Sequence, residues 1–313
     1  MKKIVLTATA LFLCLLSFSQ NVNDLIKKGI KLIDEKKYDS ALAIFNKVWS
    51  IDSSVYEIYT NRGTIFYNQK KWNESFDEYT KAIEKWPDSA DAYHYRAILL
   101  FTLTYTDDAI ADNTKALQLS TNDSLTLSCF TNRGNCYQQK REFQQAYEDY
   151  SRAYLLDSTN IGVINNIATV LDELGRSDEA IINLKKLTRI DPGFIGAYVN
   201  LGFQYTRLGK YREAIEYFDK ALLIEKDEPL ALNNRGLAKY NLNDYAGALA
   251  DINKSISIFP GNSYAYKNRA LVYLALKQKD KACADIQMAL DQKFTEVYGD
   301  EVLKLKNENC VVK

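Results

Sequence analysis

Histidine is nearly missing from this chain, which has a single one, His94, among 313 residues. One histidine cannot supply the paired imidazoles of common zinc sites, and no HExxH or DxDxDG ligand spacing occurs. No GxSxG turn accompanies His94, and no GxGxxG or GxxxxGK[ST] loop is present to hold phosphates. We therefore expect no catalytic residue, no metal site and no cofactor, and we expect His94 to be a groove or surface residue.

Net charge is missing as well, because 40 basic and 40 acidic side chains cancel. Without a cationic excess the chain has little with which to displace the counterions of phosphates, so nucleic acid is not an expected partner. Proline is scarce, at four residues, whereas tyrosine is abundant, at 22. This balance favours long uninterrupted helices with large aromatic side chains between them.

Long hydrophobic runs are missing except at the N-terminus. There Lys2 and Lys3 precede an apolar run over residues 4–16, followed by a small-x-small triplet at 17–19. The pattern is typical of a cleavable secretory signal over residues 1–19, and the run is short for a membrane span, although an uncleaved anchor is the alternative. The sequence thus predicts an exported protein that does not span the membrane after cleavage. It would reside in the periplasm, at the outer membrane or outside the cell.

Cysteine is scarce too, and no pair has the CxxC spacing of a redox or metal site. Cys129 and Cys136 are seven residues apart on one expected helix, about 10 Å along its axis, which is too far for a bond between them. We expect both to be buried as small apolar side chains. Cys283 and Cys310 could form a disulfide, which persists in exported proteins, if the last helix folds back. The sequence leaves open whether they are bonded.

What the chain has in abundance is a repeat of 34 residues. Each repeat has a small residue as its mark, a bulky residue four positions earlier and another small residue twelve positions later. The marks are Gly29, Gly63, Ala97, Gly134, Ala168, Gly202, Gly236 and Ala270. One interval is 37 residues, because residues 124–126 are inserted before the fourth repeat. The insertion predicts either a longer helix or a bend in the array.

This phasing resembles the tetratricopeptide repeat, a helix-turn-helix unit of 34 residues. The resemblance covers residues 22–296 and implies an all-α fold, a right-handed superhelical solenoid of stacked antiparallel helix pairs. The repeats are expected at residues 22–55, 56–89, 90–123, 127–160, 161–194, 195–228, 229–262 and 263–296. In the third repeat, Thr106 stands where the family usually has an aromatic residue, and Asn113 stands where it has an aromatic or aliphatic one. Residues 297–313 are expected to form a C-terminal capping helix and tail, the helix running unbroken from Glu296 to Asn309.

Asparagine recurs two residues before the mark in six repeats. These residues are Asn61, Asn132, Asn166, Asn200, Asn234 and Asn268. The resemblance implies that this position faces the concave groove, where carboxamide donors and acceptors can grip the backbone of an extended peptide. Asn135, Asn165 and Asn233 add amides to the same expected face. The alternative is that the amides only bridge neighbouring repeats. The arginines beside them are expected to pack their stems between helices and to pair with local acids.

The resemblance implies a non-enzymatic protein–protein interaction scaffold, similar to exported bacterial tetratricopeptide proteins. We expect it to bind an extended peptide or a partner protein in its concave groove, and we expect no small-molecule substrate. The alternative is an enzyme-associated adaptor or a glycan-binding module that presents substrates to a partner enzyme. A contiguous acidic and aromatic cleft would favour glycan, whereas a row of amides favours peptide backbone.

Overall fold

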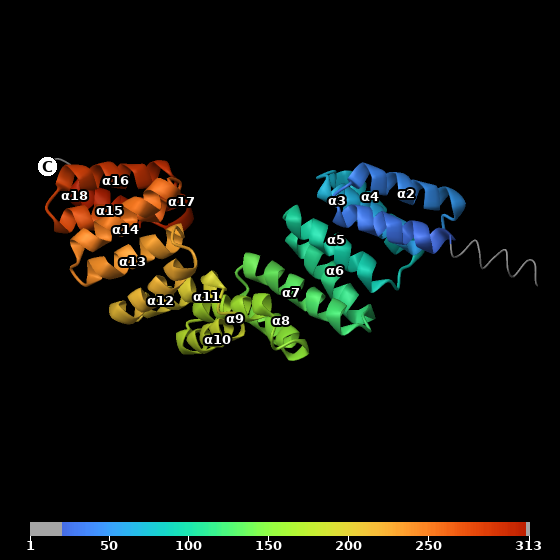
Figure 1. Cartoon of the computed structure of the whole chain (residues 1–313), viewed down its shortest axis with the longest axis horizontal. Coiled ribbons are helices and arrows are strands. Elements are labelled where there is room, and N and C mark those ends of the chain that lie inside the picture. Colours follow the sequence, from blue (N-terminus) through green and yellow to red (C-terminus); the bar gives the residue numbers. More distant parts are fainter. Residues whose placement is uncertain (1–20, 311–313) are drawn as a thin grey trace, which may run out of the picture. The chain divides into compact units, whose positions relative to one another are not determined.

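A computed structural model describes residues 21–310, and the signal predicted over residues 1–19 lies outside the described residues. The chain forms two compact units that divide between Ser158 and Thr159 (Figure 1). Every regular element within residues 21–310 is a helix. None of these helices is long and apolar enough to cross a membrane.

The first unit begins with helical residues 21–34. Its further helices are α2 (Tyr38–Ile51), α3 (Tyr56–Asn68), α4 (Trp72–Lys85), α5 (Ala90–Thr102), α6 (Thr106–Leu119), α7 (Asp123–Gln139) and α8 (Phe143–Leu156). The second unit contains α9 (Ile161–Glu173), α10 (Ser177–Ile190), α11 (Ile195–Arg207), α12 (Tyr211–Ile224), α13 (Pro229–Asn241), α14 (Tyr245–Ile258), α15 (Ser263–Ala275), α16 (Lys279–Asp291), α17 (Phe294–Tyr298) and α18 (Glu301–Asn309).

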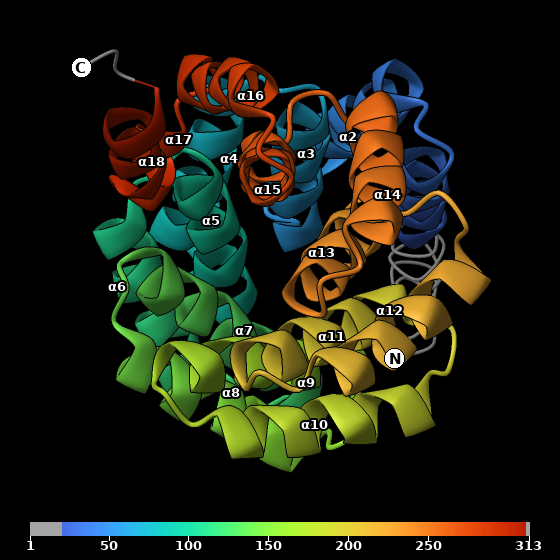
Figure 2. The same cartoon turned by 90° about the vertical axis from the view of Figure 1, so that its left-hand side faces the viewer.

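Within each unit, every helix packs against the helix that follows it in the chain, and first helices of consecutive repeats also touch. We call the helix that carries the mark the first helix of its repeat and its partner the second helix. In the second unit, the first helices α13 and α15 lie on the inner side of the curved stack of helices, and the second helices α14 and α16 lie on its outer side (Figure 2). The predicted class of stacked antiparallel helix pairs, the tetratricopeptide superhelical fold, is confirmed.

The turn inside each repeat has a fixed backbone geometry. The residue seven positions after the mark has a positive φ in every repeat, as at Lys70 (58°), Thr104 (65°) and Gly175 (74°). Only glycine adopts this left-handed conformation without steric cost, so the other repeats use it against local preference. The packing of the two helices therefore fixes the turn.

The small mark is required because the second helix comes very close. A Cβ added to Gly63 would lie 2.4 Å from the ring of Tyr79, and one added to Gly134 would lie 2.6 Å from the ring of Tyr150. Both rings belong to the core of their repeat and are almost fully buried. The glycine thus makes room for a large aromatic side chain of the second helix.

The insertion before the fourth repeat lengthens a helix, as one of the two predictions proposed. Helix α7 has 17 residues, whereas α5 and α9 have 13. The side chain of Asn122 accepts hydrogen bonds from the backbone amides of Ser124 and Leu125 and caps the longer helix. The added residues therefore extend the helix at its N-terminal end.

The C-terminal cap differs from the prediction of one helix from Glu296 to Asn309. The structure has two helices, α17 and α18, which are separated at Gly299 with a φ of 92°. That backbone angle interrupts a helix, so the continuous helix was wrong. Helix α18 packs against α16 through the buried Val302.

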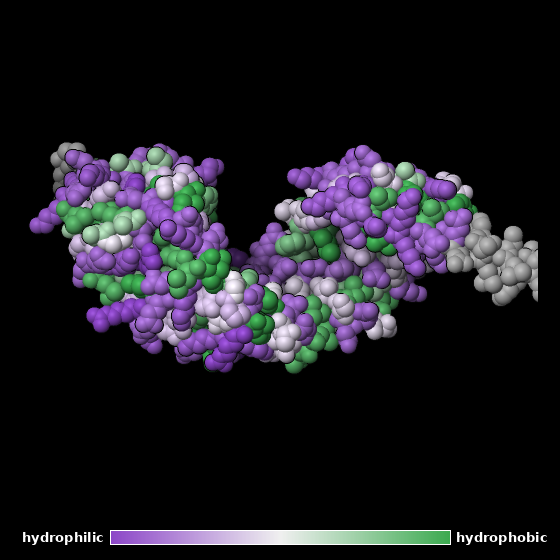
Figure 3. All heavy atoms as spheres, in the orientation of Figure 1, coloured by the Kyte–Doolittle hydropathy of each residue, from purple (hydrophilic) through white to green (hydrophobic). Residues whose placement is uncertain are grey.

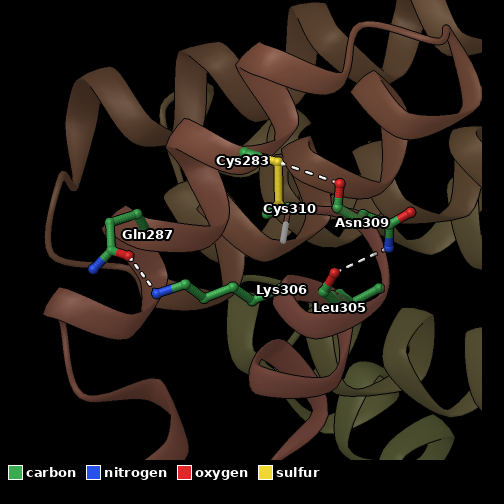
Figure 4. The surroundings of a disulfide bond; sticks show 6 residues. All are labelled: Cys283, Gln287, Leu305, Lys306, Asn309 and Cys310. Atoms are coloured by element: carbon green, nitrogen blue, oxygen red, sulfur yellow. Dashed lines mark hydrogen bonds between the residues drawn. A yellow bond between two sulfur atoms is a disulfide. The ribbon is translucent and has the colours of Figure 1, made fainter. Parts of the chain in front are cut away.

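Cys283 of α16 and Cys310 after α18 form a disulfide, with their Cα atoms 5.6 Å apart (Figure 4). Lys306 also donates a hydrogen bond to Gln287 at 2.9 Å. The cap is thus held on the last repeat by a covalent bond and a polar contact. The sequence alone had not decided whether this bond forms.

Candidate functional site: the first-helix face

The asparagines two residues before the marks all lie on first helices, one each on α3, α7, α9, α11, α13 and α15. In the second unit every first helix carries one. In the first unit the series is interrupted on α5, where Tyr95 stands in its place. The second unit therefore has the longer amide row.

Part of this row bridges neighbouring repeats. Asn200 donates a hydrogen bond to Asn165 at 3.3 Å, and Asn268 donates one to Asn233 at 3.1 Å. Asn233 in turn donates to Asn234 at 3.2 Å. Asn233 and Asn268 are almost completely buried. These two amides lie in the contact between repeats rather than on a surface open to a ligand.

The amides of the first unit are engaged differently. Asn61 donates to the carbonyl oxygen of Glu57 in its own helix at 2.7 Å. Asn135 accepts a hydrogen bond from the hydroxyl of Tyr150 at 2.7 Å. Asn132 is half-buried, and its side chain makes no hydrogen bond with the rest of the described chain. The first unit thus offers separate amides and no continuous row.

Apolar side chains follow the amides on the second unit's first helices. Phe203, Leu237 and Leu271 stand three residues after an asparagine, on the same helix face. Phe203 is 43% exposed, and the two leucines are half-buried. Asn166, Asn200 and Asn234 also remain partly exposed. We call these six residues the amide–apolar strip.

Arginine–carboxylate pairs hold the repeats together beside the strip. On α13, Arg235 donates from Nε and Nη2 to the carboxylate of Asp251 on α14, at 2.8 and 2.6 Å. Its Nη1 reaches back to Asp219 on the second helix of the preceding repeat, at 2.6 Å. One guanidinium therefore links three helices.

The same linkage recurs along the chain. The other bidentate pairs are Arg96 with Asp112, Arg133 with Asp149, and Arg269 with Asp285. Arg62 pairs more loosely with Glu78, at 3.3 Å. The prediction that these arginines pack between helices and pair with local acids is confirmed. Repeats five and six instead carry the buried, apolar Ile167 and Leu201.

Lys239 adds a contact that the sequence did not suggest, because it donates to the Asp251 carboxylate at 2.7 Å. Burial alone would raise the pKa of Asp251, but the hydrogen bonds from Arg235 and Lys239 outweigh it and lower that pKa. Asp251 is therefore a buried carboxylate that stays charged near neutral pH.

His94 is buried and not a groove or surface residue, so that prediction was wrong. Its Nδ1 lies 3.3 Å from the Sγ of Cys129, a buried residue on α7. Burial lowers the pKa of His94 and raises the pKa of Cys129 to about 12. Both groups are therefore neutral at neutral pH, and the thiol is not activated as a nucleophile. Cys136 is buried and free as well, as predicted for both cysteines.

Across residues 21–310, no group of three or more His, Cys, Asp or Glu side chains is arranged to hold a metal ion. On the face drawn in Figure 3, apolar and hydrophilic side chains are interspersed on both units. On this face, surface hydropathy alone therefore does not single out a binding surface.

Comparison with known proteins assigns the repeats to a family. Family models described as "Tetratricopeptide repeat" match residues 127–160, 161–194, 196–228 and 230–262. DnaJ homolog subfamily C member 7 of Mus musculus is 29% identical over 135 residues, which is 43% of this chain and 25% of that protein. The chain spans about a quarter or less of the length of the first curated relatives it matches.

Solved structures show the same fold. The APC/C hetero-tetramer Cut9-Hcn1 has a TM-score of 0.62 at 19% identity, covering 90% of this chain and 55% of that one. A tetratricopeptide repeat protein from Parabacteroides merdae has a TM-score of 0.59 at 21% identity, covering 81% and 99%.

Residues 127–262 are therefore tandem tetratricopeptide repeats, and the described chain has the tetratricopeptide superhelical fold. Tetratricopeptide repeat proteins mediate protein–protein interactions and are typically non-enzymatic.

Proposed function

We propose that this protein is an exported, non-enzymatic scaffold that holds an extended segment of a partner polypeptide along the amide–apolar strip of its second unit. The partner's backbone would hydrogen-bond to the amides of Asn166, Asn200 and Asn234, and its apolar side chains would contact Phe203 and Leu237.

The alternation of amides and apolar side chains carries this proposal. An extended peptide presents backbone donors and acceptors at regular intervals, and a carboxamide can satisfy both kinds. Phe203 is a large ring that remains 43% exposed beside the partly exposed Asn200. Exposed aromatic side chains on a rigid framework are common anchors of protein interfaces. The arginine–carboxylate pair of Arg235 and Asp251 supplies that rigidity.

Two observations support export. Residues 1–19 have the composition of a secretory signal. The disulfide between Cys283 and Cys310 is a bond that persists in oxidising compartments and is rare in the cytosol. We propose that the mature protein works in the periplasm, at the outer membrane or outside the cell.

A matched pair of variants tests the proposed surface. The strip variant combines Phe203→Ser with Asn234→Ala. The control combines Leu223→Ser, on an 85% exposed residue of α12, with Asn183→Ala on α10. Both variants should keep wild-type helicity by circular dichroism.

The variants are compared in cross-linking pull-downs from envelope extract, followed by titration of the captured partner's purified segment. The strip variant should bind that segment roughly tenfold or more weakly, whereas the control should bind like the wild type. Equal binding by wild type and strip variant would move the interface away from the first helices.

A further inference from the structure

A cavity of about 380 Å³ lies in the first unit and shares no residue with the amide–apolar strip. Its volume is in the range of small-ligand sites, roughly 300–1,000 Å³. It opens between α4 and the turn that joins α5 to α6, so repeats two and three share it. We call it the notch, and its lining residues are Trp72, Asn73, Phe76, Asp77, Leu100, Leu103, Tyr105 and Asp108.

Two aromatic rings of the notch are left in contact with water. Phe76 is 38% exposed and Tyr105 is 59% exposed. Tyr105 owes its position to the irregular third repeat. Thr106 stands where the preceding repeat has Trp72, and the aromatic residue comes one position earlier, at the N-terminal boundary of α6. The Thr106 hydroxyl donates to Gln139 at 3.3 Å and does not fill the space.

Neighbouring side chains hold two rings of the notch lining, those of Trp72 and Phe76, in place. Tyr67 packs edge-on against Trp72, with the ring centroids 5.6 Å apart. The guanidinium of Arg96 lies 5.7 Å from the ring of Phe76 and is itself tied to Asp112. The rings of Trp72 and Phe76 are thus held in place before any ligand binds.

Two carboxylates flank the rings and form no ion pair within residues 21–310, although the guanidinium of Arg96, itself bound to Asp112, acts on Asp108 from farther away. Asp77 and Asp108 are exposed and form no ion pair with any residue of the described chain. The adjacent Asp107 shows the contrast, because Lys140 pairs with it at 2.7 Å. The notch therefore combines electron-rich ring faces, an aliphatic floor and two unpaired negative charges.

We propose that the notch binds a basic side chain, arginine or lysine, of a partner polypeptide. Its aliphatic stem packs on Leu103 and the rings, as long cationic side chains do on apolar surfaces. Its charged end lies over the ring of Tyr105, which is more exposed than Phe76 and is not covered by Arg96, within reach of Asp77 and Asp108. An acidic and aromatic cleft can also suit a neutral sugar, but the two unpaired charges favour a cation. The notch shares no residue with the amide–apolar strip, so an experiment can refute one of the two proposed binding sites and leave the other intact.

The chain itself provides the readout. It has three tryptophans, Trp49, Trp72 and Trp86, so its indole N–H signals can be assigned by single Trp→Phe changes and followed by NMR. The purified protein is titrated with N-acetyl-arginine amide, with its neutral isostere N-acetyl-citrulline amide, and with N-acetylglucosamine. The arginine amide should shift the Trp72 signal with saturation and leave the other two unchanged.

Paired charge variants separate the notch from general attraction. The double change Asp77→Asn with Asp108→Asn should weaken arginine binding by roughly three- to tenfold, as expected for exposed ion pairs. The control changes Glu213→Gln and Glu216→Gln remove the same charge from an exposed part of α12 and should leave binding unchanged. Tyr105→Ala should also weaken binding.

Three results would overturn the proposal. Equal shifts with the citrulline amide would mean that the charge is not recognised. Saturable shifts with N-acetylglucosamine alone would assign the notch to glycan. If both charge variants weakened arginine binding equally, the notch carboxylates would not be the binding groups. If the arginine amide did not shift the Trp72 signal, the notch would not bind a basic side chain.

Discussion

Replacement of Asp251 by asparagine tests the arginine–carboxylate linkage most clearly. Asp251 accepts hydrogen bonds from Arg235 and Lys239 and has a side chain only 8% exposed. The change Asp251→Asn keeps the shape and one acceptor oxygen but removes the charge that balances two cations.

The size of the effect follows from burial. Breaking a fully buried pair costs about 3–5 kcal/mol. The side chains of Arg235 and Lys239 are 20% and 22% exposed, so water can partly replace the lost contacts. Asparagine can also still accept one hydrogen bond, so we expect the free energy of unfolding to fall by about 2–3 kcal/mol.

Urea unfolding followed by circular dichroism measures this loss as a lower midpoint. The control is Asp227→Asn, which removes an exposed carboxylate that pairs with Lys254 at 2.5 Å and should leave the midpoint unchanged. If both variants unfold at the same midpoint, the linkage does not stabilise the repeats and the reasoning fails.

The same variant predicts a pH dependence. The pKa of Asp251 is lower in the folded protein than in the unfolded chain, so its contribution is complete above the unfolded pKa of about 3.9. It is lost as the pH falls through the folded pKa. The stability difference between wild type and Asp251→Asn should therefore be constant from pH 7 to about 5 and shrink in stronger acid.

Three further predictions concern packing and cysteines. Gly134→Ala places a Cβ 2.6 Å from a buried ring and should lower the free energy of unfolding by about 1–3 kcal/mol, whereas Gly162→Ala at an exposed site should not; equal urea midpoints would contradict this. Burial raises the pKa of Cys129 to about 12 and of Cys136 to about 11, so Ellman's reagent should label neither at pH 8 until urea is added; rapid labelling of the folded protein would refute their burial. Cys283→Ser should cost about 2–4 kcal/mol and speed hydrogen exchange in α18, as reduction of the wild type should; unchanged exchange would show that the disulfide does not hold the cap.

Much of the fold could be predicted from the sequence because its packing repeats. A small residue at the mark, as at Gly134, can be recognised in the sequence, and the structure shows the ring of Tyr150 that requires it. The sequence also predicted that the arginines pair with local acids, and the structure shows the acid 16 residues after the arginine, as for Arg133 with Asp149 and Arg235 with Asp251. Local signals repeated many times are strong signals.

Features that occur once were harder to predict. His94 is buried because Cys129 of the next repeat lies against it, a contact specific to this pair of helices. The break between α17 and α18 depends on the positive φ of Gly299. Glycine also occurs within the helices of this chain, so its presence alone did not predict the break. Tyr105 and its notch depend on one irregular turn, which the sequence marked only as a missing aromatic residue.

The structure places the asparagines of the series on first helices, and their role in binding a peptide stays a prediction. A carboxamide on a helix can contact the next repeat or a ligand, and the sequence is the same in both cases. Which of the two it contacts depends on the side chain that the neighbouring repeat places beside it, as at Asn200, which donates to Asn165 in the preceding repeat. The sequence therefore located the row but could not separate bridging amides from exposed ones.

Site-specific photo-cross-linking tests the central claim most directly. A photo-reactive amino acid is placed either at Phe203 on α11 or at Leu223 on α12, and the protein is irradiated in its native envelope. Both positions are exposed, so both probes can reach a bound partner. Partner adducts from position 203 and none from position 223 are the predicted result. Adducts from position 223 alone would contradict the account, because they would place the partner on the second helices.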